Sequence, residues 1–265
     1  MGSIHQGSPQ MNKKHFIIPD CQTKEGVPLE HLTWAGKYCA EKHPDVVINI
    51  GDFADMPSLS SYDVGKKDFE GRRYTKDIAA TKKAMDLFMA PIKREILRTS
   101  KTKAPWKPRF VLTLGNHEDR INRAVNNDPK LEGLISVKDL PYEDWEVIPY
   151  LKPISIDGIV YCHFFASGVM GRPVTSAKAL TTKKHCSCVM GHVQRKEVDI
   201  QYKADGKRIT SIFAGCYYQH DEEYLGPQGN ECWRGVWVLH QVHDGEYDEM
   251  PVSIEYLKMK YKGKP

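Results

Sequence analysis

The sequence predicts a single large α/β domain, on three observations. Short apolar runs rich in β-branched residues recur along the chain, and polar side chains follow each of them, usually after a glycine or proline. Stretches with apolar residues three and four apart lie between the early runs, as expected for crossover helices. Runs of alternating apolar and polar residues follow toward the C-terminal end, which favours additional antiparallel strands.

Five apolar runs are predicted to be buried strands. In the most informative one, Arg109–Leu114, the following Gly115 permits a tight exit that brings Asn116 and His117 to the end of the strand. In an open α/β sheet, ligands bind at the edge formed by the carboxyl ends of the strands. The other four runs are His15–Ile18, Asp45–Ile50, Ile159–Cys162 and Cys186–Met190.

Helices are predicted between these strands. Apolar residues from Leu29 to Cys39 recur at helical spacing and stop near His43, and this helix is expected to connect the first two strands. A second stripe runs from Ile78 to Ile96, although Pro91 is expected to break or kink that helix because it removes an amide donor. A third helix is expected to begin near Asn122 and to loosen before Pro129.

Turn signals and alternating runs organise the rest of the chain. Asp157 and Gly158 predict a tight hairpin that delivers His163. Three alternating runs are expected to be antiparallel strands of a second sheet, namely Arg208–Phe213, Gly235–His240 and Pro251–Tyr256.

The polar residues after the five strands form a set of oxygen and nitrogen donors. One glycine followed by a carboxylate or amide is as well explained by a turn and a capped helix, but five such strand ends in one chain favour a divalent-metal site. The candidate ligands are Asp20, Gln22, Asp52, Asn116, His163, His192 and Gln194.

These motifs, in this order from Asp20 to Gln194, resemble the calcineurin-like metallophosphoesterase family, and more loosely its phage and prophage members. The resemblance implies a two-sheet sandwich flanked by helices, with a βαβαβ core and a two-metal site bridged by Asp52. The chain departs from the family at two positions, because Gln22 and Gln194 stand where the family motifs have histidine.

The resemblance also implies roles for individual residues. His117 matches the family residue that protonates the leaving oxygen or stabilises the transition state, and Asp119 is expected either to orient that imidazole or to cap a helix. One metal position would be completed by Asn116, His163 and His192, and the other by Asp20, Gln22 and Gln194.

The two glutamines change the expected metal preference. Amide oxygens in place of imidazole nitrogens favour Mn²⁺ or Mg²⁺ over Zn²⁺ and weaken the binding of late transition metals. We therefore expect two divalent ions, with Mn the first choice and Mg, Fe, Ni or Zn as alternatives. A single-metal enzyme and a degenerate metal-binding protein without catalysis remain open.

Basic and aromatic residues suggest where a phosphoester would bind. The long loop after Asp55 is either a substrate lip or a solvated excursion, and the basic loop around Trp106 has the same two interpretations. Arg120 and Arg172 are further candidates for contact with a substrate phosphate. The lip residues are Tyr62, Lys66, Lys67, Phe69, Arg72, Arg73 and Tyr74.

Composition limits the remaining possibilities. The net charge of +4 and pI near 8.5 are too mild to indicate nucleic-acid binding by themselves. Seven cysteines, an odd number with no Cys-x-x-Cys pair, argue against a disulfide framework and favour a reducing cytoplasm. No apolar run is long enough for a membrane span. Residues 1–11 are expected to be a disordered leader or cloning remnant, and residues 12–265 one domain.

The sequence thus predicts a metal-dependent phosphoesterase, and the basic and aromatic loops favour a phosphodiester in a nucleotide or nucleic acid. The attacking group would be a metal-bridged hydroxide. The alternatives are a phosphomonoesterase or protein phosphatase, and a metal-stabilised binding protein. The sequence does not predict the oligomeric state.

Overall fold

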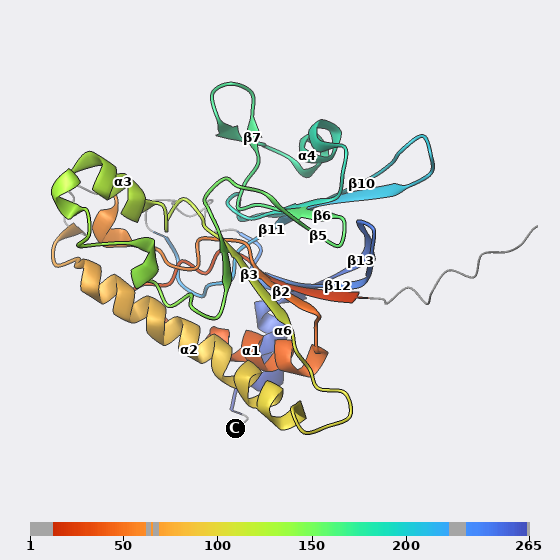
Figure 1. Cartoon of the computed structure of the whole chain (residues 1–265), viewed down its shortest axis with the longest axis horizontal. Helices are drawn as coiled ribbons and strands as arrows, with labels where there is room; N and C mark the ends of the chain where they lie inside the picture. The colour runs from red at the N-terminus through yellow and green to blue at the C-terminus, as the bar shows by residue number, and fades with distance from the viewer. Residues whose placement is uncertain (1–12, 62–64, 66–68, 223–231, 264–265) are drawn as a thin grey trace, which may run out of the picture.

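The computed structural model describes residues 13–61, 65, 69–222 and 232–263. Two β-sheets are stacked on each other, and helices cover the outer face of each sheet (Figure 1). This arrangement confirms the predicted α/β sandwich flanked by helices. The expected leader and three residues of the expected substrate lip (Tyr62, Lys66 and Lys67) lie outside the described residues.

The first sheet has six strands in the order β13-β12-β1-β2-β3-β4. β1, β2, β3 and β4 run parallel, whereas β12 pairs antiparallel with both β1 and β13. Three of the predicted strands therefore become parallel neighbours whose carboxyl ends meet at one edge. The bounds are β1 Lys13–Ile18, β2 Val46–Asn49, β3 Arg109–Thr113, β4 Glu146–Ile148, β12 Gly235–His243 and β13 Glu246–Ser253.

The second sheet has five strands in the order β10-β11-β9-β6-β5, and β7 and β8 form a separate small hairpin. The predicted turn joins β5 to β6, where Asp157 and Gly158 both have positive φ angles, 51° and 84°. The bounds are β5 Ile154–Ile156, β6 Ile159–Tyr161, β7 Ala166–Ser167, β8 Arg172–Pro173, β9 Cys188–Met190, β10 Lys196–Tyr202 and β11 Arg208–Ala214.

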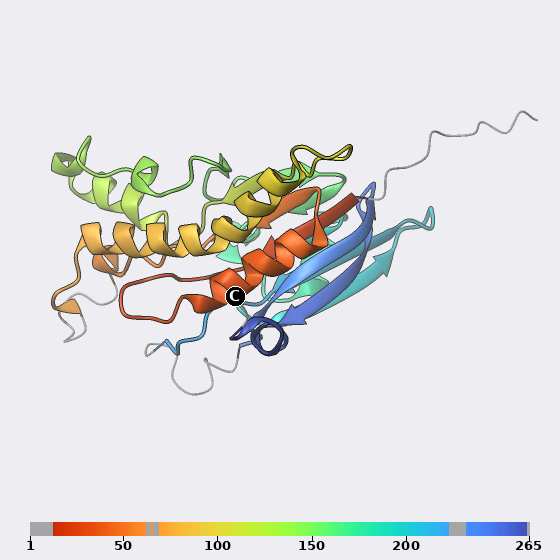
Figure 2. The same cartoon turned by 90° about the horizontal axis from the view of Figure 1, so that it is seen from below.

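Helices α1 (Glu30–Lys42) and α2 (Tyr74–Thr99) lie side by side on the outer face of the six-stranded sheet (Figure 2). α6 (Ile254–Tyr261) packs against α1, and α4 (Ala177–Lys184) covers the outer face of the five-stranded sheet. α3 (Arg120–Asn127) follows β3. Three short 3-10 turns complete the described elements: η1 Pro57–Leu59, η3 Pro129–Leu131 and η4 Val137–Asp139. None of the helices among these residues is long and apolar enough to cross a bilayer.

Alternating faces of the strands divide the core into layers. On β1, Ile17 packs between the two sheets with residues such as Tyr161 and Ile212, whereas Phe16 and Ile18 pack under the helices. Since successive side chains of a strand point to opposite faces, the continuous apolar runs follow from burial on both faces. The sandwich therefore has four layers, with the strand ends of both sheets brought together.

Pro91 does not break the helix that was expected to break or kink there. α2 continues through Pro91 to Thr99. Pro91 is buried on the face that packs against α1, where a side-chain carbon at Gly36 would lie 2.2 Å from the Phe88 carbonyl oxygen and 3.2 Å from Pro91 Cγ. Close packing of the two helices thus outweighs the loss of one helical hydrogen bond.

The expectation for the last alternating runs was partly wrong. β11 belongs to the second sheet as predicted, but β12 and β13 belong to the first sheet, because β12 pairs with β1. The run that begins at Pro251 also stops being a strand at Ser253. The Ser253 side chain accepts a hydrogen bond from the Tyr256 amide and caps α6, which starts at Ile254.

Candidate functional site

Three predicted ligands meet between the carboxyl ends of strands from both sheets. Asp52 follows β2, His163 follows β6, and His192 follows β9. Each offers one ligand atom, and these atoms all lie within 4.8 Å of one another. The first two side chains are buried and His192 is partly buried. The sheets thus place one carboxylate and two imidazoles around a common point.

Asn116, at the end of β3, joins this group. Its side-chain oxygen Oδ1 lies 3.0 Å from His163 Nε2 and 2.8 Å from His192 Nδ1. His163 Nε2 is also 3.2 Å from Asp52 Oδ2. Arg123 donates a 2.7 Å hydrogen bond to the Asn116 backbone carbonyl, which holds the loop in place. We call Asp52, Asn116, His163 and His192 the central cluster.

The second ring nitrogen of His163 shows that the cluster fits a metal ion. His163 Nδ1 lies 2.9 Å from the Ile50 carbonyl oxygen, which can only accept a hydrogen bond, so the proton of a neutral ring is on Nδ1. Although burial opposes it, the Asp52 and Asp20 carboxylates raise the pKa of His163 to about 9, so Nε2 carries a proton toward the oxygens of Asp52 and Asn116. A bound cation would take the place of that proton. Two imidazole nitrogens, a carboxylate and an amide oxygen are a donor set for a first-row divalent metal.

Glycine at position 115 is required for this geometry. A side-chain carbon there would lie 2.0 Å from Asp52 Oδ1 and 2.4 Å from the Asp52 backbone nitrogen. Only a residue without Cβ lets the chain after β3 pass so close to the carboxylate.

The second predicted ligand set consists of Asp20, Gln22 and Gln194. The group of His, Cys, Asp and Glu side chains with converging ligand atoms does not extend to Asp20 among the described residues. Asp20 is fully buried, and it accepts hydrogen bonds from the His192 backbone amide at 3.1–3.2 Å. Gln22 Oε1 is buried without a hydrogen-bond partner, whereas Gln194 Oε1 accepts a 2.8 Å hydrogen bond from the Tyr218 hydroxyl.

The unpartnered oxygen of Gln22 supports the fit of this second position. A buried carbonyl oxygen without a partner costs free energy unless an ion or a water satisfies it. The bond from Tyr218 leaves one lone pair of Gln194 Oε1 unused. One carboxylate and two amide oxygens are a donor set that fits a cation preferring oxygen ligands.

Burial and neighbouring charges alter the titration of these side chains. Burial alone would raise the pKa of Asp52, but the His117 and His163 imidazoles lower it far below its usual range. Burial, together with the charge of Asp52, raises the pKa of Asp20 to about 7 against the opposing effect of His163. Burial and the neighbouring His163 lower the pKa of His192 to about 4, so it is a neutral ligand near pH 7.

His117 lies beside the central cluster and is oriented by Asp55. Its Nδ1 is 2.6 Å from Asp55 Oδ1, and its Nε2 is 3.8 Å from Asp52 Oδ2. Although burial opposes it, the charges of Asp52 and Asp55 raise the pKa of His117, which favours the protonated ring. Lys24, 3.0 Å from Asp55 Oδ2, and Arg120 in turn hold the Asp55 carboxylate. The ring therefore directs Nε2 toward the cluster.

No family model matches the chain. No curated protein matches it either.

Several solved structures align with most of the chain. A conserved protein from Streptococcus pneumoniae described as a predicted phosphoesterase is 11% identical and aligns over 91% of this chain and 98% of its own, with a TM-score of 0.32. The phosphoesterase YfcE from E. coli is 11% identical over 91% and 99%, with a TM-score of 0.37. A dimetal phosphatase from Danio rerio is 10% identical over 91% and 99%, with a TM-score of 0.40. Since these scores are all below 0.5, the chemistry must be argued from the residues of this chain.

The orienting role expected of Asp119 does not agree with the contacts. Its carboxylate accepts a 3.1 Å hydrogen bond from Asn122 and lies 3.6 Å from Arg123 Nε, one turn along α3. Asp119 occupies the position before α3, but its side chain makes no capping hydrogen bond. Asp55 takes the orienting role instead, because the strand end after β2 faces the His117 ring.

The two arginines proposed to bind substrate differ in position. Arg120 is directed inward, where it donates to the Asp55 carbonyl at 2.8 Å and approaches His117 Nε2 at 3.4 Å. It therefore borders the site but is largely occupied by Asp55. Arg172 is exposed in the β7–β8 hairpin, and none of its described contacts is with the central cluster.

Two functional residues were not predicted as site residues. Asp55 stands three residues after Asp52, and this second aspartate of the Gly51–Asp55 segment was the available signal. Glu118, fully buried, accepts hydrogen bonds from the backbone amides of Asp52 and Gly115, at 3.0 and 2.9 Å. It joins the loops after β2 and β3, and its place directly after His117 was the only sequence signal.

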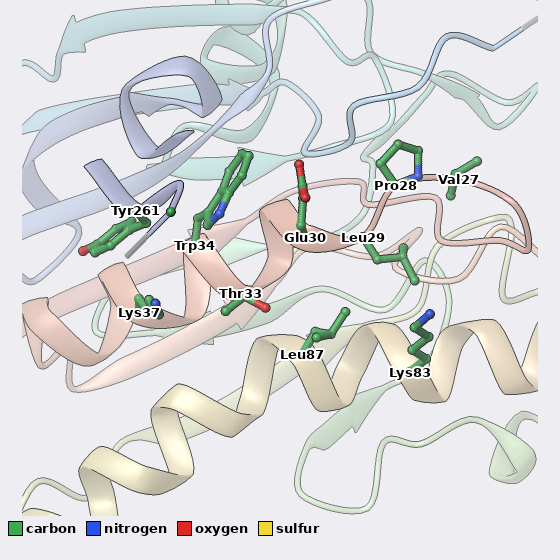
Figure 3. A pocket seen from close by; sticks show the side chains of 11 residues that line it. Val27, Pro28, Leu29, Glu30, Thr33, Trp34, Lys37, Lys83, Leu87 and Tyr261 are labelled. Carbon is green, nitrogen blue, oxygen red and sulfur yellow. The ribbon is translucent and has the colours of Figure 1, made fainter. Parts of the chain in front are cut away.

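A separate hollow of about 530 Å³ lies between α1, α2 and the C-terminal segment (Figure 3). Leu29, Trp34, Leu87 and Tyr261 line it, with Lys37 and Lys83 also on its wall. None of the predicted ligands lines it, so it is distinct from the central cluster.

Proposed function

We propose that this chain is a metal-dependent phosphoesterase of the calcineurin-like metallophosphoesterase type. The observation that carries the proposal is the convergence of Asp52, His163 and His192 from strand ends of two different sheets. A proton-carrying imidazole, His117, lies at the border of this cluster. A protein that only binds metal does not need a proton donor beside its ligands. The position of His117 therefore favours an enzyme over a binding protein.

The residues divide into two metal positions and a proton donor. The central cluster would hold one ion, and Asp20, Gln22 and Gln194 would hold a second, with Asp52 between them. Divalent ions held there would neutralise the oxygens of a phosphate group and make a water nucleophilic at neutral pH. The second position offers mainly oxygen donors, which favours Mn²⁺ or Mg²⁺ there over Zn²⁺.

His117 would supply the proton that the leaving oxygen needs. Asp55 accepts the Nδ1 proton, and the charges of Asp52 and Asp55 raise the pKa of the ring, which favours a second proton on the Nε2 atom that faces the cluster. Arg120 keeps Asp55 in place and adds positive charge beside the expected phosphate position.

We propose a phosphodiester in a nucleotide or nucleic acid as the substrate. Support comes from the basic and aromatic residues near the loop after Asp55, where Arg72 lies 5.7 Å over the Phe69 ring. A phosphomonoester or a phosphoprotein is the alternative, because the central cluster itself is equally suited to either ester.

The test is a metal-resolved activity panel. The chain would be stripped with a chelator and reloaded separately with Mn²⁺, Mg²⁺, Ni²⁺ or Zn²⁺. It would then be assayed on an aryl phosphodiester, an aryl phosphomonoester, cyclic nucleotides, and single- and double-stranded DNA and RNA. We expect hydrolysis that depends on added metal and is highest with Mn²⁺.

Two histidine variants make the panel specific. His192→Ala should lose both bound metal and hydrolysis, since it removes one ligand of the central cluster. His240→Ala, which changes a histidine on β12 outside the cluster, should keep both. Metal binding by the wild type without hydrolysis of any ester would favour the binding-protein alternative. Absence of both would contradict the metal centre itself.

A further inference from the structure

Strand β10 forms the free edge of the five-stranded sheet, and it carries an exposed apolar strip. Among the strands of the described residues, β10 pairs only with β11, and it lies at the outside of the molecule in both views (Figures 1 and 2). Every second side chain is exposed: Val198 by 37%, Ile200 by 46% and Tyr202 by 72%. We call these three residues the β10 strip. A long apolar edge strand is a template for pairing with another strand.

The backbone groups of the same three residues point away from the sheet. In the antiparallel pair with β11, Lys203 faces Lys207 and its amide donates a 2.9 Å hydrogen bond to the Lys207 carbonyl. Hydrogen bonding alternates along an antiparallel ladder, so the odd-numbered residues of β10 bond to β11. The N–H and C=O groups of Val198, Ile200 and Tyr202 are therefore directed to the outer edge.

The usual protections of an edge strand are absent from this stretch. β10 contains no proline, and no charged side chain interrupts the exposed face between Val198 and Tyr202. The charged residues Glu197 and Asp199 lie on the other face, toward α4. There, one oxygen of Glu197 accepts a hydrogen bond from the Ala177 amide at 2.7 Å, and the side chain remains 36% exposed.

We propose that β10 pairs antiparallel with β10 of a second copy of this chain, centred on Ile200, so that the two five-stranded sheets become continuous. This pairing is independent of the phosphoesterase proposal. In this register the two Ile200 side chains face each other across the two-fold axis. Val198 lies opposite Tyr202 of the second copy, so each member of the strip gains an apolar cross-strand neighbour.

Charge on the opposite face selects this register. Centring on Ile200 places Glu197 opposite Lys203 of the second copy and Asp199 opposite Gln201. A register centred on Asp199 would instead place two aspartates side by side, which is unfavourable. The surface is thus self-complementary in backbone hydrogen bonds, apolar side chains and charge, as a two-fold interface requires.

The test is the mass of the full chain in solution, measured by sedimentation equilibrium from micromolar to millimolar concentration. The wild type should sediment at twice the chain mass of 30.3 kDa. Ile200→Pro removes one outward-facing N–H and leaves the bonds to β11 intact, so it should weaken the dimer at least about tenfold. Ile200→Lys should do the same, because two like charges would meet on the axis.

Matched variants separate this interface from general effects of mutation. Met259→Lys makes the same kind of change at an α6 residue that is 75% exposed, and should leave the dimer unchanged. Lys203→Glu would face Glu197 of the second copy and should weaken the dimer roughly tenfold. In the register centred on Asp199 it would face Arg195 and tighten the dimer.

Circular dichroism melting would confirm that each variant is folded, and Lys203→Glu changes only an exposed side chain. A wild type that remains at 30.3 kDa throughout, or an Ile200→Lys variant that dimerises normally while folded, would overturn the proposal. Tightening by Lys203→Glu would overturn the register.

Discussion

At the scale of single residues, the site depends on contacts that orient groups rather than on the ligands alone. Asp55 is not one of the four residues of the central cluster, yet it fixes the ring of His117 through a 2.6 Å contact. The carboxylate is itself held by Lys24 and Arg120. Its pKa is lowered well below the ordinary value because His117, Lys24 and Arg120 outweigh the effect of burial. Asp55 is therefore ionised whenever His117 is needed as an acid.

We expect Asp55→Asn to lower kcat about 10- to 100-fold while the bound metal stays near the wild-type content. Loss of the carboxylate charge lowers the pKa of His117, so the alkaline limb of the kcat profile should move to lower pH. Steady-state kinetics across pH and metal analysis would measure both effects. Asp119→Asn is the control and should resemble the wild type, since Asp119 contacts Asn122 and Arg123. Similar losses in both variants would count against the orienting role of Asp55.

At the scale of elements, α1 and α2 approach each other closely enough to define the layer that supports the first sheet. Gly36 is the point of approach, since a side-chain carbon there would lie 2.2 Å from the Phe88 carbonyl oxygen. The buried helix faces pack on β1, β2 and β3, whose ends supply Asp20, Asp52 and Asn116. Separation of the two helices would therefore disturb the support of the site.

We expect Gly36→Ala to lower the free energy of unfolding by about 1 to 3 kcal/mol, because backbone atoms must shift to admit the new methyl group. Thr33→Ala, one turn earlier in α1, is the matched control and should change stability by less than about 0.5 kcal/mol. Urea unfolding followed by circular dichroism would measure both. If Gly36→Ala left the urea midpoint unchanged, the two helices would have moved apart without loss of unfolding free energy, which would contradict the prediction.

Local sequence signals predicted where strands and turns lie better than they predicted which strands pair with each other. The glycine after Arg109–Leu114 and the Asp157–Gly158 turn specify short-range geometry, and both predictions were confirmed. The alternation in Gly235–His240 indicated a strand but carried no information about which sheet it joins, since the β12 partner, β1, lies more than two hundred residues earlier. The Ser253 cap was a local signal that the alternating pattern around it concealed.

At the scale of the whole molecule, the central cluster joins the two sheets. Asp52 and Asn116 come from the first sheet, whereas His163 and His192 come from the second. An ion bound between them would link the two halves of the sandwich and would be released when the sheets separate. The convergence of these strand ends was predictable from the motifs, but the hydrogen bond from the Tyr218 hydroxyl to Gln194 was not, because Tyr218 lies in the loop after β11.

We expect metal removal to lower the melting temperature. An ion present at about a hundred times its Kd stabilises the folded chain by about 2.7 kcal/mol, which corresponds to roughly 5 to 10 °C for a protein of this size. Differential scanning calorimetry with a chelator and with added Mn²⁺ would measure the shift. In His192→Ala, which lacks one ligand of the central cluster, the shift should be smaller than in the wild type. A wild type whose melting does not respond to any divalent metal would contradict this linkage.

Four of the seven candidate ligands have a left-handed backbone, at Gln22, Asp52, His192 and Gln194, with φ between 43° and 64°. Glycine and asparagine adopt this conformation most readily, aspartate and histidine enter it at a smaller cost, and the two glutamines do so at a cost of about 1 kcal/mol or more each. Folding alone would be served better by glycine or asparagine at every one of them. If a related protein were no longer selected for this site, these four positions would be among the first to be substituted. The protein would then become more stable as it lost the ability to bind the ion.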